Sequence, residues 1–148
     1  MPNLKTWHDY KNIYSVDMMF AYLNSVKHPV SKLSVESLLP QLSVKVWGDW
    51  SPMDVLEKME MKKYQANAKR IRDANMSYPI IVTGSHTIVD GYHRVAKAYM
   101  EGKKEIRAHV FDAALMKKCM LVKGMDFGKL NSLAVYDIVE LWNKRFCE

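Results

Sequence analysis

The sequence predicts an α+β fold in which a small mixed sheet is flanked by helices, and three observations favour it. Two short apolar runs, residues 78–82 and 86–90, are joined by a Thr-Gly-Ser segment that is typical of a hairpin or tight turn. Helical patterns lie on both sides of this pair of runs. The stretch 105–111 alternates apolar and polar residues and predicts a further strand.

The helix expected before the two runs covers residues 61–74. Its apolar stripe, at positions i, i+4 and i+7, consists of Tyr64, Ala68 and Ile71. Lys63, Asn67 and Arg70 keep the same spacing one residue earlier, so we expect them to line the adjacent flank. The helix would therefore present a polar and basic flank beside its buried one.

The helix expected after the two runs begins at about Tyr92. It should end at Gly102, because glycine is favoured just past a helix C-terminus. The residues that we expect it to bury are Val95, Ala98 and Tyr99. Its start follows directly on the second apolar run, so a strand and a helix meet at Asp90 and Gly91.

Two shorter elements are expected upstream. Residues 32–38 alternate in polarity and predict a strand that Pro40 closes. Ser51 followed by Pro52, with Asp54 in the first turn, predicts the capped start of a short helix.

Both ends of the chain are expected to be helical. Ser15 is a typical N-cap for a helix with apolar residues at Val16, Met19, Phe20 and Leu23. Further helices are predicted near 112–120 and 132–145. The apolar stripe of the last one consists of Val135, Ile138, Val139, Trp142 and Phe146. This stripe either packs on the domain or binds a partner.

The 148 residues predict one domain with an ordinary core, since 49% of them are hydrophobic. The expected core covers about 32–112, with helical extensions at 1–30 and 113–148. A net charge of +6 favours anionic partners. Cys119 and Cys147 lack zinc-site spacing, so we expect reduced thiols in a cytoplasmic protein. We expect no secretory leader and no membrane span, because no apolar run approaches the roughly 18 residues required.

The stretch Asp90-Gly91-Tyr92-His93-Arg94 carries the strongest indication of chemistry. The first turn of a helix points backbone N–H groups outward at the positive end of its dipole, which suits phosphate. Arg94 adds a planar fork for phosphate oxygens, and His93 can donate a hydrogen bond or shuttle a proton. Asp90 is a candidate Mg²⁺ ligand. The alternative is a common Asp-Gly turn followed by polar capping residues.

The stretch from Tyr78 to Phe111, with its Pro-Ile strand and Asp-Gly-x-His-Arg helix start, resembles the core of the ParB/sulfiredoxin fold. The resemblance extends over about residues 32–112. It implies a nucleotide pocket for ATP, ADP or CTP with Mg²⁺. The phosphates would be held by the helix start, and the preceding helix would add polar and basic groups. The implied nucleotide-binding residues are Gly91, Tyr92, His93, Arg94, Lys63, Asn67 and Arg70.

Departures from the family patterns narrow the expected chemistry. Sulfiredoxins have a nucleophilic cysteine where this chain has Tyr92, so peroxiredoxin repair is not expected. Partition-type ParB proteins carry a helix-turn-helix region and a dimer domain after this core. The chain that follows the core here is too short for both, so chromosome partition is not expected. The motif is closest to kinases of free serine, which use an acidic base; Glu36 and Asp49 are the acids available. The layout around Ser51-Pro52 also resembles uncharacterised short proteins, some of them viral.

We therefore expect a nucleotide-dependent phosphotransferase acting on a small hydroxyl acceptor, or an NTP hydrolase. Its catalytic residues would be Asp90, His93, Asp49 and Glu36, with Asp90 on the metal. One alternative is a nucleic-acid-binding or nuclease-like module, in which lysines at 61–72 and at Lys97, Lys103 and Lys104 contact phosphates. Trp47, Trp50 or Tyr92 would then stack on bases. The other alternative is a non-catalytic interaction domain.

Overall fold

The computed structural model describes residues 4–147 and confirms the α+β class. Over that range it contains eight α-helices, one 3-10 helix and two separate sheets, one of three strands and one of four. The chain divides into two compact units. The central unit is Pro29–Val110, and the terminal unit combines the chain before Pro29 with the chain from Phe111 onward.

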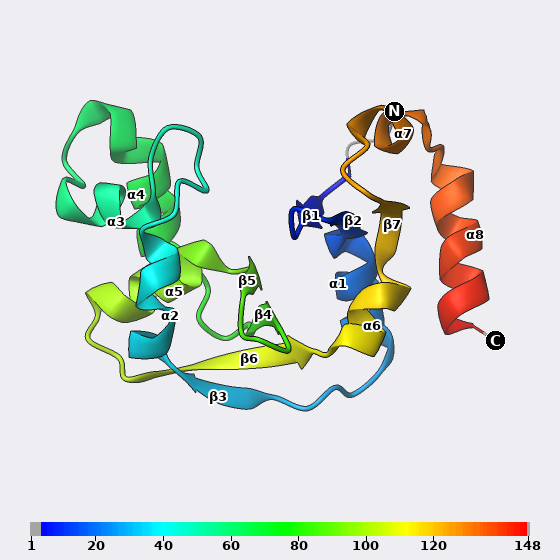
Figure 1. Cartoon of the computed structure of the whole chain (residues 1–148). Coiled ribbons are helices and arrows are strands. Elements are labelled where there is room, and N and C mark those ends of the chain that lie inside the picture. The colour runs from blue at the N-terminus through cyan, green and yellow to red at the C-terminus, as the bar shows by residue number, and fades with distance from the viewer. Residues whose placement is uncertain (1–3, 148) are drawn as a thin grey trace. The chain divides into compact units, whose positions relative to one another are not determined.

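The four-stranded sheet belongs to the central unit. Its strands are β3 (Ser31–Ser34), β4 (Ile80–Thr83), β5 (Ile88–Asp90) and β6 (Glu105–Phe111), in the order β3-β6-β4-β5. β3 and β6 run side by side and antiparallel (Figure 1), with Leu33 opposite Ile106. β4 and β5 form the predicted antiparallel hairpin, in which the Thr83 N–H donates to the Thr87 carbonyl at 2.9 Å.

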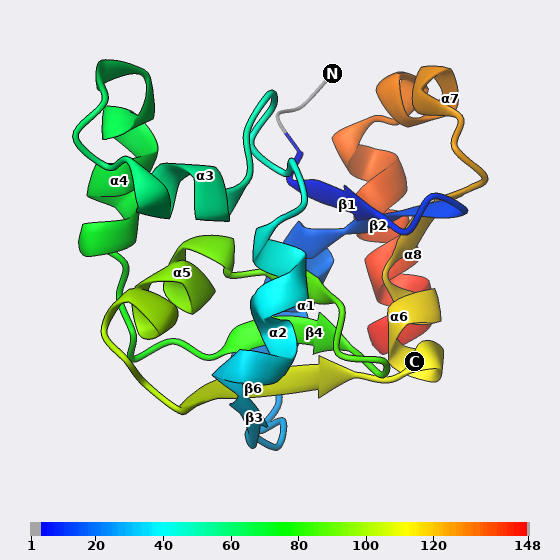
Figure 2. The same ribbon diagram turned by 60° about the vertical axis from the view of Figure 1, so that its left-hand side comes forward.

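One helix organises the packing of the central unit. α2 (Val35–Leu42), α3 (Pro52–Glu57) and α4 (Gln65–Arg72) all pack against α5 (Tyr92–Met100), as Figure 2 shows. A 3-10 helix, η1 (Lys62–Tyr64), leads into α4. One apolar cluster joins α2 and α5 to the sheet, and a second joins α3 and α4 to Ala96 of α5. α5 therefore lies between both parts of the core, which fixes the position of its first turn.

Gly91 sets the angle at which β5 passes into α5. Its φ of +118° lies in a region that side chains rarely adopt, and a Cβ here would lie 2.5 Å from Cγ2 of Ile80. Glycine is therefore required both by the backbone conformation and by the close approach of β4.

The start of α3 confirms the expected cap. The Asp54 N–H donates to Ser51 Oγ at 3.1 Å, and the Ser51 N–H donates to Asp54 Oδ2 at 2.8 Å. This reciprocal pair satisfies two backbone donors that the helix leaves without intrahelical partners. Pro52 occupies the first turn, where its missing N–H costs nothing.

Two expectations for the central unit were wrong. Residues 32–38 are not one strand: β3 ends at Ser34, whose side chain caps α2, and Val35, Leu38 and Leu42 form the buried side of that helix. Over so few residues, apolar positions spaced three and four apart, as in a helix, can be mistaken for the alternation of a strand. Pro40 is tolerated because it lies close to the end of the helix. Tyr99, expected to be buried, is 42% exposed.

The terminal unit contains strands that the sequence pattern did not indicate. Its sheet consists of β1 (Thr6–His8), β2 (Asn12–Ser15) and β7 (Met120–Lys123), paired antiparallel in that order. Its helices are α1 (Val16–Ser25), α6 (Ala113–Lys118), α7 (Phe127–Ser132) and α8 (Val135–Phe146). The extensions are therefore helical only in part, because three- and four-residue strands are too short for a recognisable alternation.

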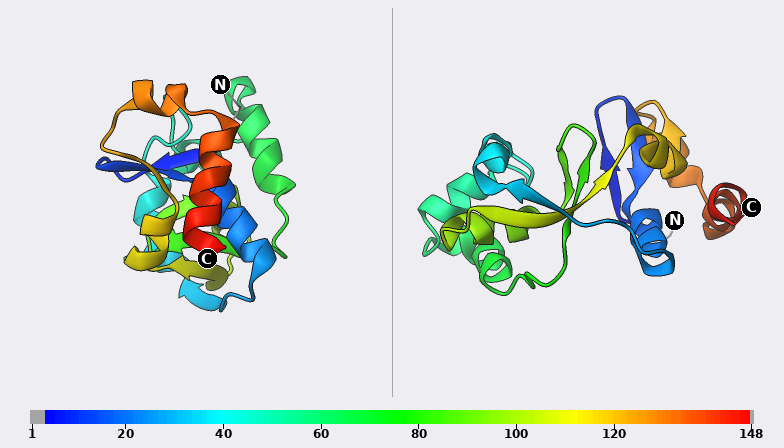
Figure 3. Two further views of the ribbon diagram at one scale, coloured as in Figure 1. Left: turned by 90° about the vertical axis from the view of Figure 1, so that its right-hand side faces the viewer. Right: turned by 90° about the horizontal axis from the view of Figure 1, so that it is seen from below.

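The last helix is attached to its unit by one side. The Arg145 guanidinium donates to the carbonyls of Lys118 and Met120, and the Phe146 ring lies 5.7 Å from that of Tyr22 on α1. The left view of Figure 3 shows α8 in front of α1. Val135 and Val139, expected in its apolar stripe, are 57% and 49% exposed. Between residues 4 and 147, no helix is both long enough and apolar enough to cross a membrane.

Substitution of Gly91 tests the close approach of β4 to α5. We expect Gly91→Ala to lower the free energy of unfolding by roughly 3 kcal/mol, through backbone strain and overpacking against Ile80. Gly102→Ala is the matched control, because Gly102 also has a positive φ but no atom within 4 Å of a Cβ. It should cost only about 1 kcal/mol. Equal losses in urea titrations would contradict this account.

The two cysteines should differ in reactivity. Burial raises the pKa of the Cys119 thiol to about 12, and the positive charge of Arg145 opposes this only in part. At pH 8 Cys119 would therefore be almost entirely in the unreactive thiol form. Cys147 is exposed. We expect iodoacetamide to label Cys147 alone in the native protein and both cysteines in urea, as mass spectrometry of peptides would show. Equal labelling of both in the native protein would contradict the burial.

Candidate functional site

The candidate site is the junction of β5 and α5, and the chain is arranged there as the motif predicts. β5 ends at Asp90, Gly91 is the N-cap, and α5 begins at Tyr92. The first helical hydrogen bond runs from the Val95 N–H to the Gly91 carbonyl at 2.9 Å. The N–H groups of the first turn therefore face the end of the helix where an anion is favoured.

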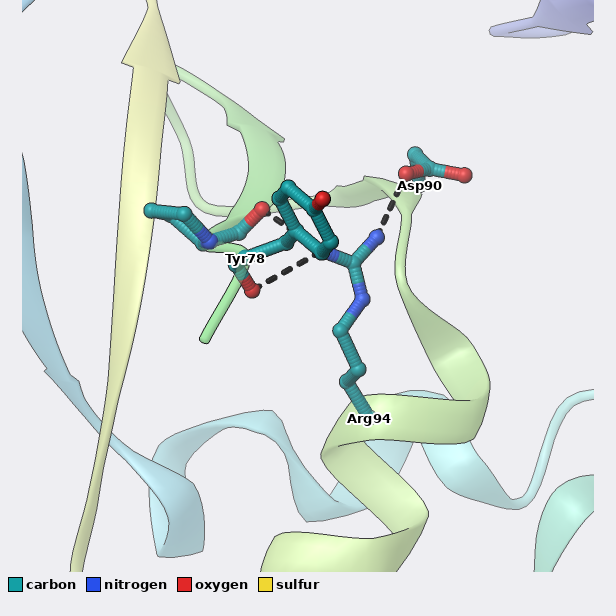
Figure 4. A network of polar contacts seen from close by, with 4 residues as sticks. Tyr78, Asp90 and Arg94 are labelled. Carbon is teal, nitrogen blue, oxygen red and sulfur yellow. Dashed lines mark hydrogen bonds and ion pairs between the residues drawn. The ribbon is translucent and has the colours of Figure 1, made fainter. Parts of the chain in front are cut away.

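Arg94 does not extend as an open fork toward this end of the helix. Its Nη1 donates to the carbonyl oxygens of Tyr78 and Pro79 at 2.9 and 2.7 Å, and its Nη2 pairs with Asp90 Oδ2 at 2.6 Å (Figure 4). The side chains of Arg94 and Asp90 are only 16% and 11% exposed. The guanidinium expected to bind phosphate is thus engaged in joining α5 to the start of β4.

His93 contacts a different set of neighbours. Its Nε2 lies 3.0 Å from Asn67 Oδ1 on α4, and its ring stacks on Trp47 with centroids 4.3 Å apart and planes 16° apart. With the amide oxygen as acceptor, Nε2 carries the hydrogen of this bond. The imidazole is therefore fixed from two sides, one polar and one aromatic. The side chains of His93 and Arg94 are held by separate partners.

The basic flank expected on the preceding helix is partly assembled around this imidazole. Asn67 is half-buried and reaches His93, whereas Lys63 and Arg70 are exposed. The Lys63 ammonium lies 5.0 Å from the Tyr64 ring centroid. Hydrogen bonding from the Ser51 N–H lowers the pKa of Asp54, with smaller contributions from the charges of Lys45 and Lys63. Lys45 and Lys63 therefore both act on the N-terminus of α3.

The three expected acids lie in different places. Asp90 is paired with Arg94. Asp49 is exposed in the turn bridged by Trp47 and Trp50, two residues from the indole that stacks on His93. Glu36 lies in the first turn of α2, where the Val35 N–H donates to the Lys104 carbonyl beyond the C-terminus of α5. Since α5 has nine residues, that end is about 13 Å from its start, and Glu36 is not brought to His93.

The aromatic residues considered for base stacking have intramolecular roles in the central unit. Tyr92 packs against the apolar cluster of the sheet, and Trp50 meets Tyr64 edge-to-face at 5.4 Å. Trp50 Nε1 is buried without a hydrogen-bond partner in the described part of the chain. Trp47, which was considered for base stacking, packs against the cluster of α3 and α4 and covers the imidazole. The sequence signal for it was the Trp-Gly-Asp-Trp turn directly before a capped helix.

These side chains do not fit a preformed magnesium site. Within residues 4–147, no group of three or more His, Cys, Asp or Glu residues lies close enough together to hold a metal ion. Asp90, the expected ligand, shares its carboxylate with a guanidinium, and that positive charge disfavours a divalent cation at the same oxygens. We therefore derive no step through a protein-held metal.

Three basic side chains hold the segment that connects α4 to β4. Lys97 Nζ donates to the carbonyls of Arg72 and Ala74 at 2.7 and 3.0 Å, and Arg107 donates to that of Ser77. Arg94 holds the last carbonyls before the strand. Lys97, considered for nucleic-acid phosphates, therefore contributes to the fold, because it satisfies acceptors that have no ladder partner there.

Comparisons with protein-family models, with curated proteins and with solved structures found no match to this chain. The resemblance of residues 32–112 to the ParB/sulfiredoxin core therefore remains a hypothesis that depends on the motif.

Removing the Arg94 guanidinium tests its role in the fold. Arg94→Ala should destabilise the protein by about 3 kcal/mol, because it leaves the mostly buried Asp90 carboxylate unpaired. Asp90→Asn in the same background should recover part of the loss. Lys69→Ala, which breaks the exposed pair with Asp73, is the control and should leave the urea midpoint nearly unchanged. An Arg94→Ala variant as stable as this control would show that the Arg94 contacts are dispensable.

Proposed function

We propose that the central unit binds the phosphate groups of a nucleotide, ATP, ADP or CTP, at the start of α5. The observation that carries the proposal is the imidazole of His93, held by Asn67 and Trp47 in the first turn of a helix that begins on Gly91. With Nε2 donating to Asn67, the imidazole can donate to an anion only through Nδ1 in its imidazolium form, beside the outward-facing backbone N–H groups that an anion also requires.

The charges on the neighbouring elements support this choice of ligand. Lys63 and Arg70 are exposed on η1 and α4, the elements that also present Asn67. Lys45 lies within electrostatic range of Asp54, as Lys63 does. These cations lie at the N-terminus of α3 and on η1 and α4, and α3 and α4 pack against α5, so they raise the local concentration of anions beside the proposed site. The resemblance to ParB/sulfiredoxin proteins implies the same class of ligand at the same motif.

The proposal assigns different tasks to the two basic residues of the motif. His93 and the first-turn N–H groups contact phosphate oxygens, while Arg94 and Asp90 position the helix start on β4. A bound nucleotide would have to displace Arg94 from three acceptors before this side chain could contact phosphate. Mg²⁺, where present, would come with the nucleotide phosphates.

Phosphoryl transfer is the reaction that such a site supports best, with water or a small hydroxyl compound as acceptor. Catalysis of this reaction consists mainly of positioning and charge stabilisation. Asp90 is engaged by Arg94 and Glu36 lies toward the other end of α5, so we assign the task of orienting the acceptor to Asp49, two residues from the indole that stacks on His93. The three aromatic residues expected to stack on bases in the nucleic-acid alternative, Trp47, Trp50 and Tyr92, are engaged in packing, which weakens that alternative.

Isothermal titration with ATP, ADP and CTP tests the proposal, with and without Mg²⁺. Lys63→Ala and Arg70→Ala should each weaken the affinity by roughly tenfold, and His93→Ala should weaken it further. Lys104→Ala is the matched control: it removes the same charge beyond the opposite end of α5 and should leave the affinity unchanged. Thermal melts of each variant separate lost binding from lost folding. The absence of heat with all three nucleotides would overturn the proposal.

A further inference from the structure

The turn between β1 and β2 presents an exposed tyrosine on an unusual backbone. Tyr10 has a φ of +66°, which glycine or asparagine adopts far more readily than an aromatic residue. Its side chain is 79% exposed, so the ring gains little from packing. Residues held in such conformations cluster where a ligand is bound, provided that the surrounding structure fixes them.

The surrounding structure does fix this turn. Asp9 Oδ1 accepts from the N–H groups of Lys11 and Asn12 at 2.9 and 2.7 Å, and Asp9 Oδ2 accepts from the Tyr14 hydroxyl at 3.0 Å. The Tyr10 N–H points to His8 Nδ1 at 3.3 Å. These bonds determine the backbone on both sides of Tyr10 and leave its ring outside.

Two further rings lie beside Tyr10. The His8 ring meets Tyr10 edge-on at 4.8 Å and Phe127, at the start of α7, at 6.2 Å. Phe127 is 47% exposed. Asn12 Oδ1 accepts from the Gly124 N–H at 2.9 Å, which holds the β1–β2 turn against the segment that leads to α7. We call His8, Tyr10 and Phe127 the aromatic tip.

Lysines surround the aromatic tip. Lys11 follows Tyr10, Lys123 is opposite Asn12 in the β2–β7 register, and Lys129 lies two residues beyond Phe127. All three are exposed, and none of them forms an ion pair with the part of the chain that the structure describes. The nearby Asp9 and Asp126 are occupied by backbone N–H groups.

From this arrangement we propose that the terminal unit binds single-stranded nucleic acid at the aromatic tip. Exposed rings offer surfaces on which bases stack, and flanking lysines neutralise the phosphates between them. Binding to a lipid surface generally uses the apolar face of an amphipathic helix, whereas His8 and Tyr10 lie at the β1–β2 turn and Phe127 begins a helix of only six residues. The proposal concerns another unit of the chain and is independent of nucleotide binding at α5.

Fluorescence anisotropy of the full chain with a fluorescein-labelled thymidine oligomer of about 20 nucleotides tests the proposal. Tyr10→Gly is the decisive variant, because it removes the ring and relieves the backbone strain, so the protein should remain at least as stable. We expect affinity to fall about fivefold or more, as loss of one stacked base does. Lys11→Gln and Lys123→Gln should each reduce the salt slope by about 0.7. Tyr136→Ala, which removes an equally exposed tyrosine from α8, should change nothing.

Three results with the oligomer would overturn the proposal. These outcomes are no binding at low salt, binding that Tyr10→Gly leaves intact, and binding that is lost only when Arg70 and Arg72 of α4 are replaced. Sedimentation with anionic phospholipid vesicles tests the remaining class of ligand, a lipid surface. Tyr10-dependent binding to vesicles without binding to the oligomer would assign the aromatic tip to membranes.

Discussion

The central unit depends on one guanidinium. Arg94 reaches from the first turn of α5 to two successive carbonyls at the start of β4 and to the carboxylate that ends β5. A planar group with several donors can satisfy three acceptors at once, which a lysine ammonium does with less geometric control. Arg94 thereby fixes the positions of β4, β5 and α5 relative to one another. The position of His93, and with it the candidate site, follows from this junction.

The junction of β5 and α5 also shows which parts of the site can be predicted from local sequence. The strand, the glycine and the helix start could be predicted because each depends on neighbouring residues. The partners of the two basic side chains could not, because Tyr78 and Asn67 lie 16 and 26 residues away along the chain. The helical spacing predicted that Asn67 lies on the polar flank of its helix, but the spacing could not show that its partner is His93. Glu36 illustrates the converse, since an acid of the expected type lies at the wrong end of α5.

The terminal unit was harder to predict than the central one for a similar reason. α1 carries a strong local signal in Ser15, as the start of α3 in the central unit does in Ser51 with Asp54. β1, β2 and β7 have three or four residues each, and they become strands by pairing with one another. Hydrophobic alternation cannot be recognised over so few positions, so the pairing of distant segments was the missing information. α8 carries the predicted apolar stripe, yet none of its described residues is fully buried.

The pairing of β2 with β7 has a consequence for how the protein is made. On the ribosome, the partner of β2 emerges only after more than a hundred further residues have been synthesised. The central unit, whose contacts all lie within one continuous stretch, can acquire its structure during that interval. Until then Ile13 and Tyr14 of β2, which are buried in the folded protein, lack the neighbours that bury them. The unpaired edge of β2 can meanwhile associate with other nascent chains. A chain released before Met120–Lys123 has been added would therefore lack the strand that covers this edge, and we expect it to be less soluble than the full chain.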